Sequence, residues 1–162
     1  MLNLLGKIME NVKNQSLVVS ALNDLLKINN DRVQGYQKAI ELTSDENLKT
    51  LFQQLAFDSS KNINELSDQI FKINGKPQES TTMGGKFYRT WMDVKAAFTG
   101  NDKHSLLVDC EYGEDMALDA YKKVENDEDL NLDHATNTIL VNQKQRVEHG
   151  HDAIKRLRDT TK

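Results

Sequence analysis

The chain has 162 residues, with one proline, eight glycines, one cysteine and a formal net charge of −4. This length fits one domain with a core of its own, while so few turn-forming residues exclude an all-β sandwich or barrel. The single cysteine excludes an intrachain disulfide, the acidic balance leaves no basic footprint for nucleic acid, and no apolar stretch has the length of a membrane-spanning helix.

Residues 1–16 are predicted to form an amphipathic N-terminal extension. Their apolar side chains recur at helical spacing, at Leu2, Leu5, Met9 and Val12. Neither a continuous apolar segment nor a small-residue cleavage site follows, as a signal peptide would require. We therefore expect a cytoplasmic protein.

Two helices are predicted next, over residues 17–43 and 45–73. The apolar stripe of the first repeats every 3.5 residues, at Leu22, Leu26, Asn29, Val33, Tyr36 and Ile40. The stripe of the second consists of Leu48, Phe52, Leu55, Ser59, Asn62, Leu66 and Ile70. Ser16 is the expected N-cap of the first helix, and Thr43 with Glu46 has the spacing of a capping box for the second. Because their connection is short, these helices should form an antiparallel hairpin.

Residues 75–101 are predicted to be a long crossover, because they contain most of the helix breakers. These breakers are Gly75, Pro77, Gly84, Gly85 and Gly100. The spacing of Phe87, Trp91, Val94 and Phe98 indicates one short amphipathic helix within the crossover. A connection of this length can run the whole bundle, since a helix of similar length spans about 40 Å.

A second hairpin is predicted from helices over residues 102–126 and 133–159. Asp102 is the expected N-cap of the former, and its stripe is Leu107, Cys110, Glu114, Ala117, Tyr121 and Val124. The stripe of the latter is Leu140, Lys144, Val147, His151 and Ile154. The pattern of hairpin, crossover and hairpin predicts a single all-α domain over residues 17–160.

Polar residues inside these stripes point to a metal site. Glu114 and His151 occupy stripe positions, and Glu111 and Glu148 each lie one turn before them. Glu148 and His151 form an E-x-x-H motif, whose i, i+3 spacing directs both side chains to one face. Carboxylate and imidazole together suit iron, manganese or zinc. We therefore predict that Glu111, Glu114, Glu148 and His151 are the ligands of one metal ion.

The same residues allow a metal-free interpretation, because the other half of the chain lacks ligands. All four histidines follow residue 103. The polar side chains on the stripes of the first two helices are all uncharged, namely Asn29, Ser59 and Asn62. A buried ion-paired cluster is the alternative, and Glu114 then needs a partner, for which Arg32 or His151 is the natural candidate. A two-metal site completed by a second chain is a third interpretation. Cys110 is expected to be a packed thiol.

Two segments resemble rubrerythrin-type domains. The segment LFQQLAFDSSKNINEL (51–66) resembles their second helix, with Ser59 and Asn62 where that family carries Glu and His. The segment EHGHDAIKRL (148–157) resembles their fourth helix, with its E-x-x-H in the ligand places.

Three stretches narrow this resemblance. The segments LNDLLKINNDRVQGYQKAIE (22–41) and CEYGEDMALDAYKK (110–123), with the crossover between them, resemble a bacterial ferritin-like family of uncharacterised function. In the crossover the resemblance rests on Gly84, Gly85, Arg89 and Trp91. It covers residues 17–160 and implies a ferritin-like up-down four-helix bundle in a short cytoplasmic protein. It implies no reaction, since a fold does not confer an activity.

Three functions remain open. The first is a non-enzymatic bundle that acts by binding, with a degenerate half-site for one iron, manganese or zinc ion. The second is a di-metal carboxylate oxidoreductase, a ferroxidase or peroxide-handling protein, with its site completed by a second chain. The third is a metal-free structural or stress-related interaction protein. We expect no enzyme activity and no nucleic-acid partner. Because ferritin-like bundles often self-associate, a homo-oligomer is the expected assembly, and residues 1–16 either cover the bundle or reach a partner.

Overall fold

The computed structural model describes residues 2–79 and 102–161. Within these ranges the chain forms four helices and no strand, which confirms the all-α prediction. The helices are α1 (Leu2–Leu42), α2 (Glu46–Lys72), α4 (Lys103–Glu125) and α5 (His134–Thr160). The short helix predicted around Trp91 lies outside the described residues.

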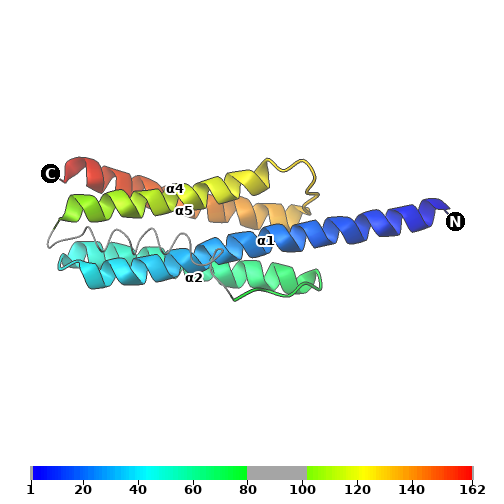
Figure 1. Ribbon diagram of the computed structural model, residues 1–162, viewed down its shortest axis with the longest axis horizontal. Coiled ribbons are helices and arrows are strands. Elements are labelled where there is room, and N and C mark those ends of the chain that lie inside the picture. Colours follow the sequence, from blue (N-terminus) through cyan, green and yellow to red (C-terminus); the bar gives the residue numbers. More distant parts are fainter. Residues whose placement is uncertain (1, 80–101, 162) are drawn as a thin grey trace.

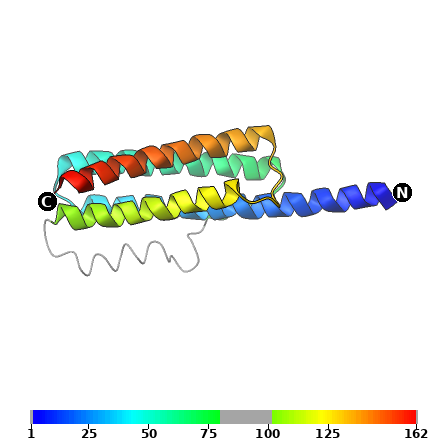
Figure 2. The same cartoon turned by 90° about the horizontal axis from the view of Figure 1, so that it is seen from above.

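The four helices form a bundle of two antiparallel hairpins, α1 with α2 and α4 with α5 (Figures 1 and 2). Helix α1 packs against α2 and α4, and α5 packs against α4 and α2, so α1 and α5 lie on one diagonal of the bundle. Helix α2 ends at the opposite end of the bundle from the start of α4, and the two helices therefore run parallel (Figure 1). The connection between them must link the two ends.

The predicted stripes of α2 and α4 face the core. Every stripe position of both helices is buried, including the polar residues Ser59, Asn62 and Glu114. The largest buried apolar side chains come from all four helices and include Leu22, Phe52, Leu107 and Ile154. The 3.5-residue spacing therefore identified the helix faces that meet at the bundle axis.

Helix α1 is longer than predicted. It runs without a break for 41 residues from Leu2, and Ser16, the expected N-cap, lies exposed within it. Neither glycine nor proline occurs between Gly6 and Gly35, so nothing in the local sequence ends a helix near residue 17. The predicted extension and the first bundle helix are thus one element.

The other three helices begin at aspartates. Asp45, and not Thr43, is the N-cap of α2, and its side chain accepts hydrogen bonds from the backbone N–H groups of Asn47 and Leu48. Thr43 instead accepts a bond from the N–H of Asp45 at 3.1 Å. Asp102 caps α4, as predicted, and Asp133 caps α5. Each cap satisfies backbone donors that the first helical turn leaves unpaired.

The end of α2 brings the chain close against α1. Asn74 adopts a left-handed φ of 57°, and the Gly75 N–H donates to the Ile70 carbonyl at 2.9 Å. A Cβ atom on Gly75 would lie 2.7 Å from a methyl of Val19. Helix α2 therefore ends within one residue of the predicted limit at residue 73, and Gly75 is also required for the close approach to α1. No helix among the described residues is both long and apolar enough to span a membrane.

The half-buried carboxyl group of Asp109 predicts a pH-dependent stability. Partial burial, together with the charge of Asp102, raises the pKa of Asp109 to about 6. Because the unfolded-state pKa is about 4, the group stabilises the fold when protonated, and this contribution is lost as the pH rises through 6. We expect Asp109→Asn to stabilise the protein by about 0.5–1 kcal/mol at pH 7.5, after allowance for its solvent exposure, and to have little effect at pH 4. Urea unfolding of both proteins at the two pH values tests this, and an equal difference at both would contradict it.

Candidate functional site

Glu114, the predicted metal ligand at the centre of α4, lies in an ion pair with Arg32 of α1. The Arg32 Nη2 atom donates to both carboxylate oxygens, at 2.8 Å to Oε1 and 3.0 Å to Oε2. The Tyr36 hydroxyl donates to Oε1 as well. The two charged side chains are 1% and 0% exposed. Of the two partners predicted for Glu114, the structure therefore has Arg32 and not His151.

The protonation of this cluster follows from its burial. Burial is the largest single effect on Arg32 and would lower its pKa, but the charge and hydrogen bond of Glu114, together with Tyr36 and Tyr121, raise that pKa overall. Burial, and then the same carboxylate, raises the pKa of the Tyr36 hydroxyl well above its usual value. Arg32 thus stays charged and Tyr36 stays a hydrogen-bond donor. An isolated buried charge would be costly, whereas this arrangement gives the carboxylate three charge-assisted or neutral donor contacts.

A chain of hydrogen bonds extends from this ion pair across the bundle. Arg32 Nη1 contacts Asn29 Oδ1 at 3.4 Å, and Asn29 Nδ2 donates to the Tyr121 hydroxyl oxygen at 2.8 Å. Tyr121 donates in turn to Gln143 Oε1 at 2.8 Å. Burial raises the pKa of Tyr121 to about 12, so its hydroxyl keeps the proton that it donates. This series of hydrogen bonds links α1, α4 and α5 through buried side chains.

Helix α2 closes the network at the other side of the bundle. Asn62 Nδ2 donates to Asn29 Oδ1 at 3.0 Å, and Gln143 Nε2 donates to Glu65 Oε2 at 2.9 Å. Glu65 also forms an ion pair with Arg146, at 2.9 Å. Partial burial would raise the pKa of Glu65, but the bonds from Arg146 and Gln143 lower it overall. The network therefore ends in a second, partly exposed ion pair.

The other three predicted ligands lie toward the edge of the α4–α5 interface. Glu111 is bound by Arg158 and lies 3.9 Å from His151 Nε2. That nitrogen lies closer, at 3.0 Å, to Asp115 Oδ1. Glu148 is partly exposed. The structure thus brings Glu111 and His151 near each other and gives Glu114 to Arg32.

The register of α5 explains this placement. Its buried positions include Gln143 and Gly150, each one residue before the predicted core positions Lys144 and His151. A Cβ atom on Gly150 would lie 3.6 Å from Glu114 Cδ, so α5 presents a glycine to the carboxylate. His151 is displaced to the flank of the helix, where its side chain is 17% exposed. The predicted stripe of α5 was therefore correct at its apolar positions and wrong at its polar ones.

Metal binding at the predicted residues stays a prediction. In the two ranges that the structure describes, no three His, Cys, Asp or Glu side chains gather as they would to hold a metal ion. Sequence reasoning named Arg32 as a partner but missed Gln143 and Arg146 as members of the network. Gln143 carried a usable signal, since it lies three residues after Leu140 and four before Val147.

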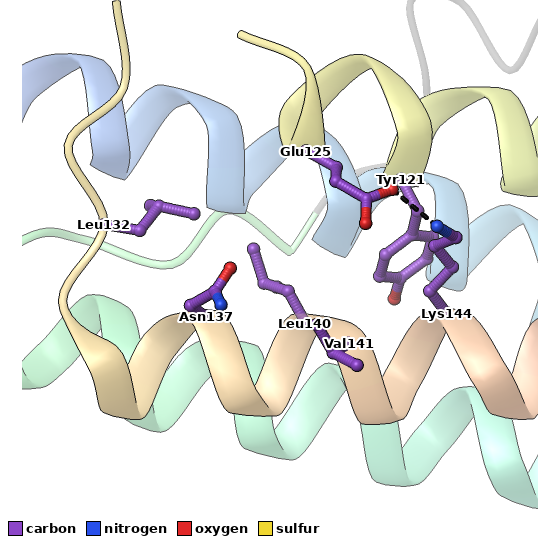
Figure 3. Close-up of a pocket in the computed structure, with 7 residues that line it drawn as sticks. All are labelled: Tyr121, Glu125, Leu132, Asn137, Leu140, Val141 and Lys144. Atoms are coloured by element: carbon purple, nitrogen blue, oxygen red, sulfur yellow. Dashed lines mark hydrogen bonds and ion pairs between the residues drawn. The ribbon is translucent and has the colours of Figure 1, made fainter. Parts of the chain in front are cut away.

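A small cavity lies beside the network, between α4, α5 and the loop that joins them (Figure 3). Tyr121 and the Glu125–Lys144 ion pair line one part of it, and Leu132 and Asn137 lie at the other. Its volume is about 20 Å³, which is room for about one water molecule. This cavity is therefore a small packing gap beside Tyr121, and it is too small for a substrate.

The ion pair predicts strong coupling between Arg32 and Glu114. Removal of one partner leaves a buried charge uncompensated, so Arg32→Met and Glu114→Leu should each destabilise the protein by about 3–5 kcal/mol. The double variant removes both charges, and its stability should return to within about 2 kcal/mol of the parent. Urea unfolding of the four proteins measures this coupling. Additive losses in the double variant would contradict the assignment of the pair as the central interaction.

The single thiol predicts slow chemical modification. Cys110 is 1% exposed, and burial, with a smaller effect of Glu114, raises its pKa well above the usual value. Because the thiolate is the reactive form, the folded protein should react with a disulfide reagent at pH 8 at least about 100-fold more slowly than the protein in urea. Comparable rates in the two states would show that Cys110 is accessible.

Comparisons with known proteins identify a family but no activity. The family model described as "Domain of unknown function (DUF2383)" matches residues 17–127, more than half of the chain. A comparison with curated proteins found no match. The match covers α2, α4 and the part of α1 that lies within the bundle, including Arg32 and Glu114. The chain therefore belongs to the DUF2383 family.

Proposed function

We propose that this protein is a non-enzymatic bundle of the ferritin-like class, which acts by binding a protein partner and needs no metal. The observation that carries the proposal is the Arg32–Glu114 ion pair, because a cation that belongs to the chain already neutralises the central carboxylate. In ferritin-like metal proteins, carboxylates and E-x-x-H motifs from all four helices surround the metals at this place. Here the corresponding layer holds Asn29, Asn62, Gly150 and the ion pair.

The topology supports the ferritin-like class. Two hairpins with a single long connection between parallel helices are typical of ferritin-like bundles, whereas simple up-down bundles have only short loops. The parallel arrangement of α2 and α4 fits the former (Figure 1). The resemblance of the sequence to a bacterial ferritin-like family points the same way, and with it to a cytoplasmic location.

A second candidate function is the binding of one iron, manganese or zinc ion at the edge of the α4–α5 interface. The observation in its favour is that His151 Nε2 lies 3.0 Å from Asp115 and 3.9 Å from Glu111. Imidazole with two carboxylates is a ligand set that these metals accept. Arg158 would have to release Glu111 first. A two-metal oxidoreductase would require further ligands from a second chain.

Metal analysis separates these candidates. We expect the purified protein to contain no stoichiometric metal, and its melting temperature to stay within about 1 °C on addition of Fe²⁺, Mn²⁺ or Zn²⁺, because a ligand stabilises only the state that it binds. Elemental analysis and thermal unfolding give the readouts. His151→Ala and His149→Ala form a matched pair, since His149 is exposed on the same helix.

Two outcomes would overturn the metal-free proposal. Uptake of about one ion per chain that is lost in His151→Ala and kept in His149→Ala would establish the second candidate. Uptake of two ions per chain, in an assembly of more than one chain, would instead support the oxidoreductase.

A further inference from the structure

The first part of α1 projects past the end of the bundle (Figures 1 and 2). Residues 3–13, here called the α1 extension, are exposed at every position. The first side chains of α1 that bond to the bundle are those of Asn14 and Gln15. Asn14 exchanges two hydrogen bonds with the backbone of Asn131, and Gln15 donates to the Ile73 carbonyl. The α1 extension is thus a helical arm beyond the last point of attachment.

One face of this arm is apolar. It consists of five side chains that are 50–66% exposed, namely Leu4, Leu5, Ile8, Met9 and Val12. The charged residues Lys7, Glu10 and Lys13 belong to the rest of the helix surface. Exposed apolar patches of this kind mark interaction sites in soluble proteins, because their exposure to water is unfavourable.

The apolar face continues the seam that packs inside the bundle. Leu5, Ile8 and Val12 are spaced by three and four residues, and the same alternation continues past the polar Gln15 to Val19, Leu22 and Leu26. Inside the bundle the neighbouring helices α2 and α4 cover this seam. A seam with this heptad spacing is complementary to another helix with the same spacing. The binding partner that fits the α1 extension is therefore a helix.

We propose that the α1 extension binds the α1 extension of a second copy of this chain, in an antiparallel pair about a two-fold axis near Gly6 and Lys7. Leu5 then lies level with Ile8 of the second copy, and Ile8 with its Leu5. Leu4 and Met9 flank the pair. The contact is isologous, so it closes as a dimer and does not propagate. Because both arms point away from their bundles along the helix axis, the bundles lie at opposite ends of the dimer.

The area and the charges favour a second copy. Five half-exposed side chains can bury at most about 500 Å² on each copy, or about 1,000 Å² in total, which is near the lower limit for a specific interface. The charged residues between Leu4 and Val12 are Lys7 and Glu10, and their helical positions face away from the seam. Two arms can therefore pair along the seam without charge repulsion. A membrane surface fits less well, since helices that lie on membranes carry many lysines and arginines on the polar face, and this arm has two lysines and one glutamate.

This inference deepens the proposed function, because it names the partner. It is tested separately from metal binding, since Lys13 is 19 residues from Arg32 along α1, a separation of about 28 Å. The metal content of the Ile8→Asp variant therefore tests only the proposed metal-free function. The oligomeric state tests only the pairing of the α1 extensions.

Sedimentation equilibrium of the full chain tests the dimer. We expect a concentration-dependent dimer for the parent, and at least an about 100-fold weaker association for Ile8→Asp, because the pair would bury an unpaired charge. Asn3→Asp places the same charge on the polar face and should leave association unchanged. Both positions are exposed, so far-UV circular dichroism should show equally folded proteins. A parent that is monomeric at about 200 μM, or an Ile8→Asp dimer of parental strength, would overturn the proposal.

Disulfide formation tests the antiparallel orientation. A mixture of Leu5→Cys and Ile8→Cys proteins should cross-link under mild oxidation, while Val12→Cys alone should not, because its two copies would lie about 16 Å apart along the axis. The natural Cys110 is buried and does not interfere. Rapid cross-linking of Val12→Cys would show a parallel pair and overturn this arrangement. Binding of a monomeric parent to vesicles of phosphatidylglycerol and phosphatidylethanolamine would overturn it in favour of a membrane surface.

Discussion

Two opposite charges held away from water impose the main constraint on this bundle. Arg32 and Glu114 must keep each other and their neutral partners, because either charge alone would be unstable in the interior. Through Asn29 and Tyr121 the pair is bonded to Gln143, and through it to α2. A shift of one helix by one turn, about 5.4 Å, would break several of these bonds at once. The network links all four helices and therefore opposes such a shift.

In the function that we propose, the same constraint separates this chain from metal-dependent bundles. A metal centre needs ligands that are free to bind and a site that admits water or substrate. Both oxygens of Glu114 are occupied by Arg32, and Gly150 fills the facing position on α5. Unlike a bound metal ion, the guanidinium of Arg32 is a covalent part of the chain, so neither chelators nor redox conditions affect it. An interior of this kind suits a scaffold whose activity lies on its surface.

The sequence predicted the fold well, because the relevant signals are local and repeat along each helix. The stripes of α2 and α4 are dense enough to identify their buried faces position by position. The start of α1 was misplaced because Ser16 is a good capping residue that is equally tolerated within an exposed helix surface. Thr43 and Asp45 are both able to cap α2, and only the backbone path selects between them.

The candidate site was harder to predict, because helical periodicity does not resolve adjacent residues. With 3.6 residues per turn, Gln143 and Lys144 are both compatible with the apolar positions of α5, as are Gly150 and His151. The choice between them depends on which side chain finds a partner on α2 or α4, and that information lies far away in the sequence. The requirement that Glu114 be paired was predictable from its position, since it follows from the cost of burying a carboxylate.

The aspartate caps give the bundle an uneven response to acid. Hydrogen bonds, from Lys103 above all, hold the pKa of Asp45 below its usual value, and bonds from Ser105 and Thr136 do the same for Asp102 and Asp133. Each cap therefore stabilises its helix above the unfolded-state pKa and loses that effect as the pH falls through the lower, folded value. The starts of α2 and α4 lie at one end of the bundle, where Lys103 also bridges to Asp45 (Figure 1). Acidification should thus fray this end first, because two of the three aspartate caps lie there.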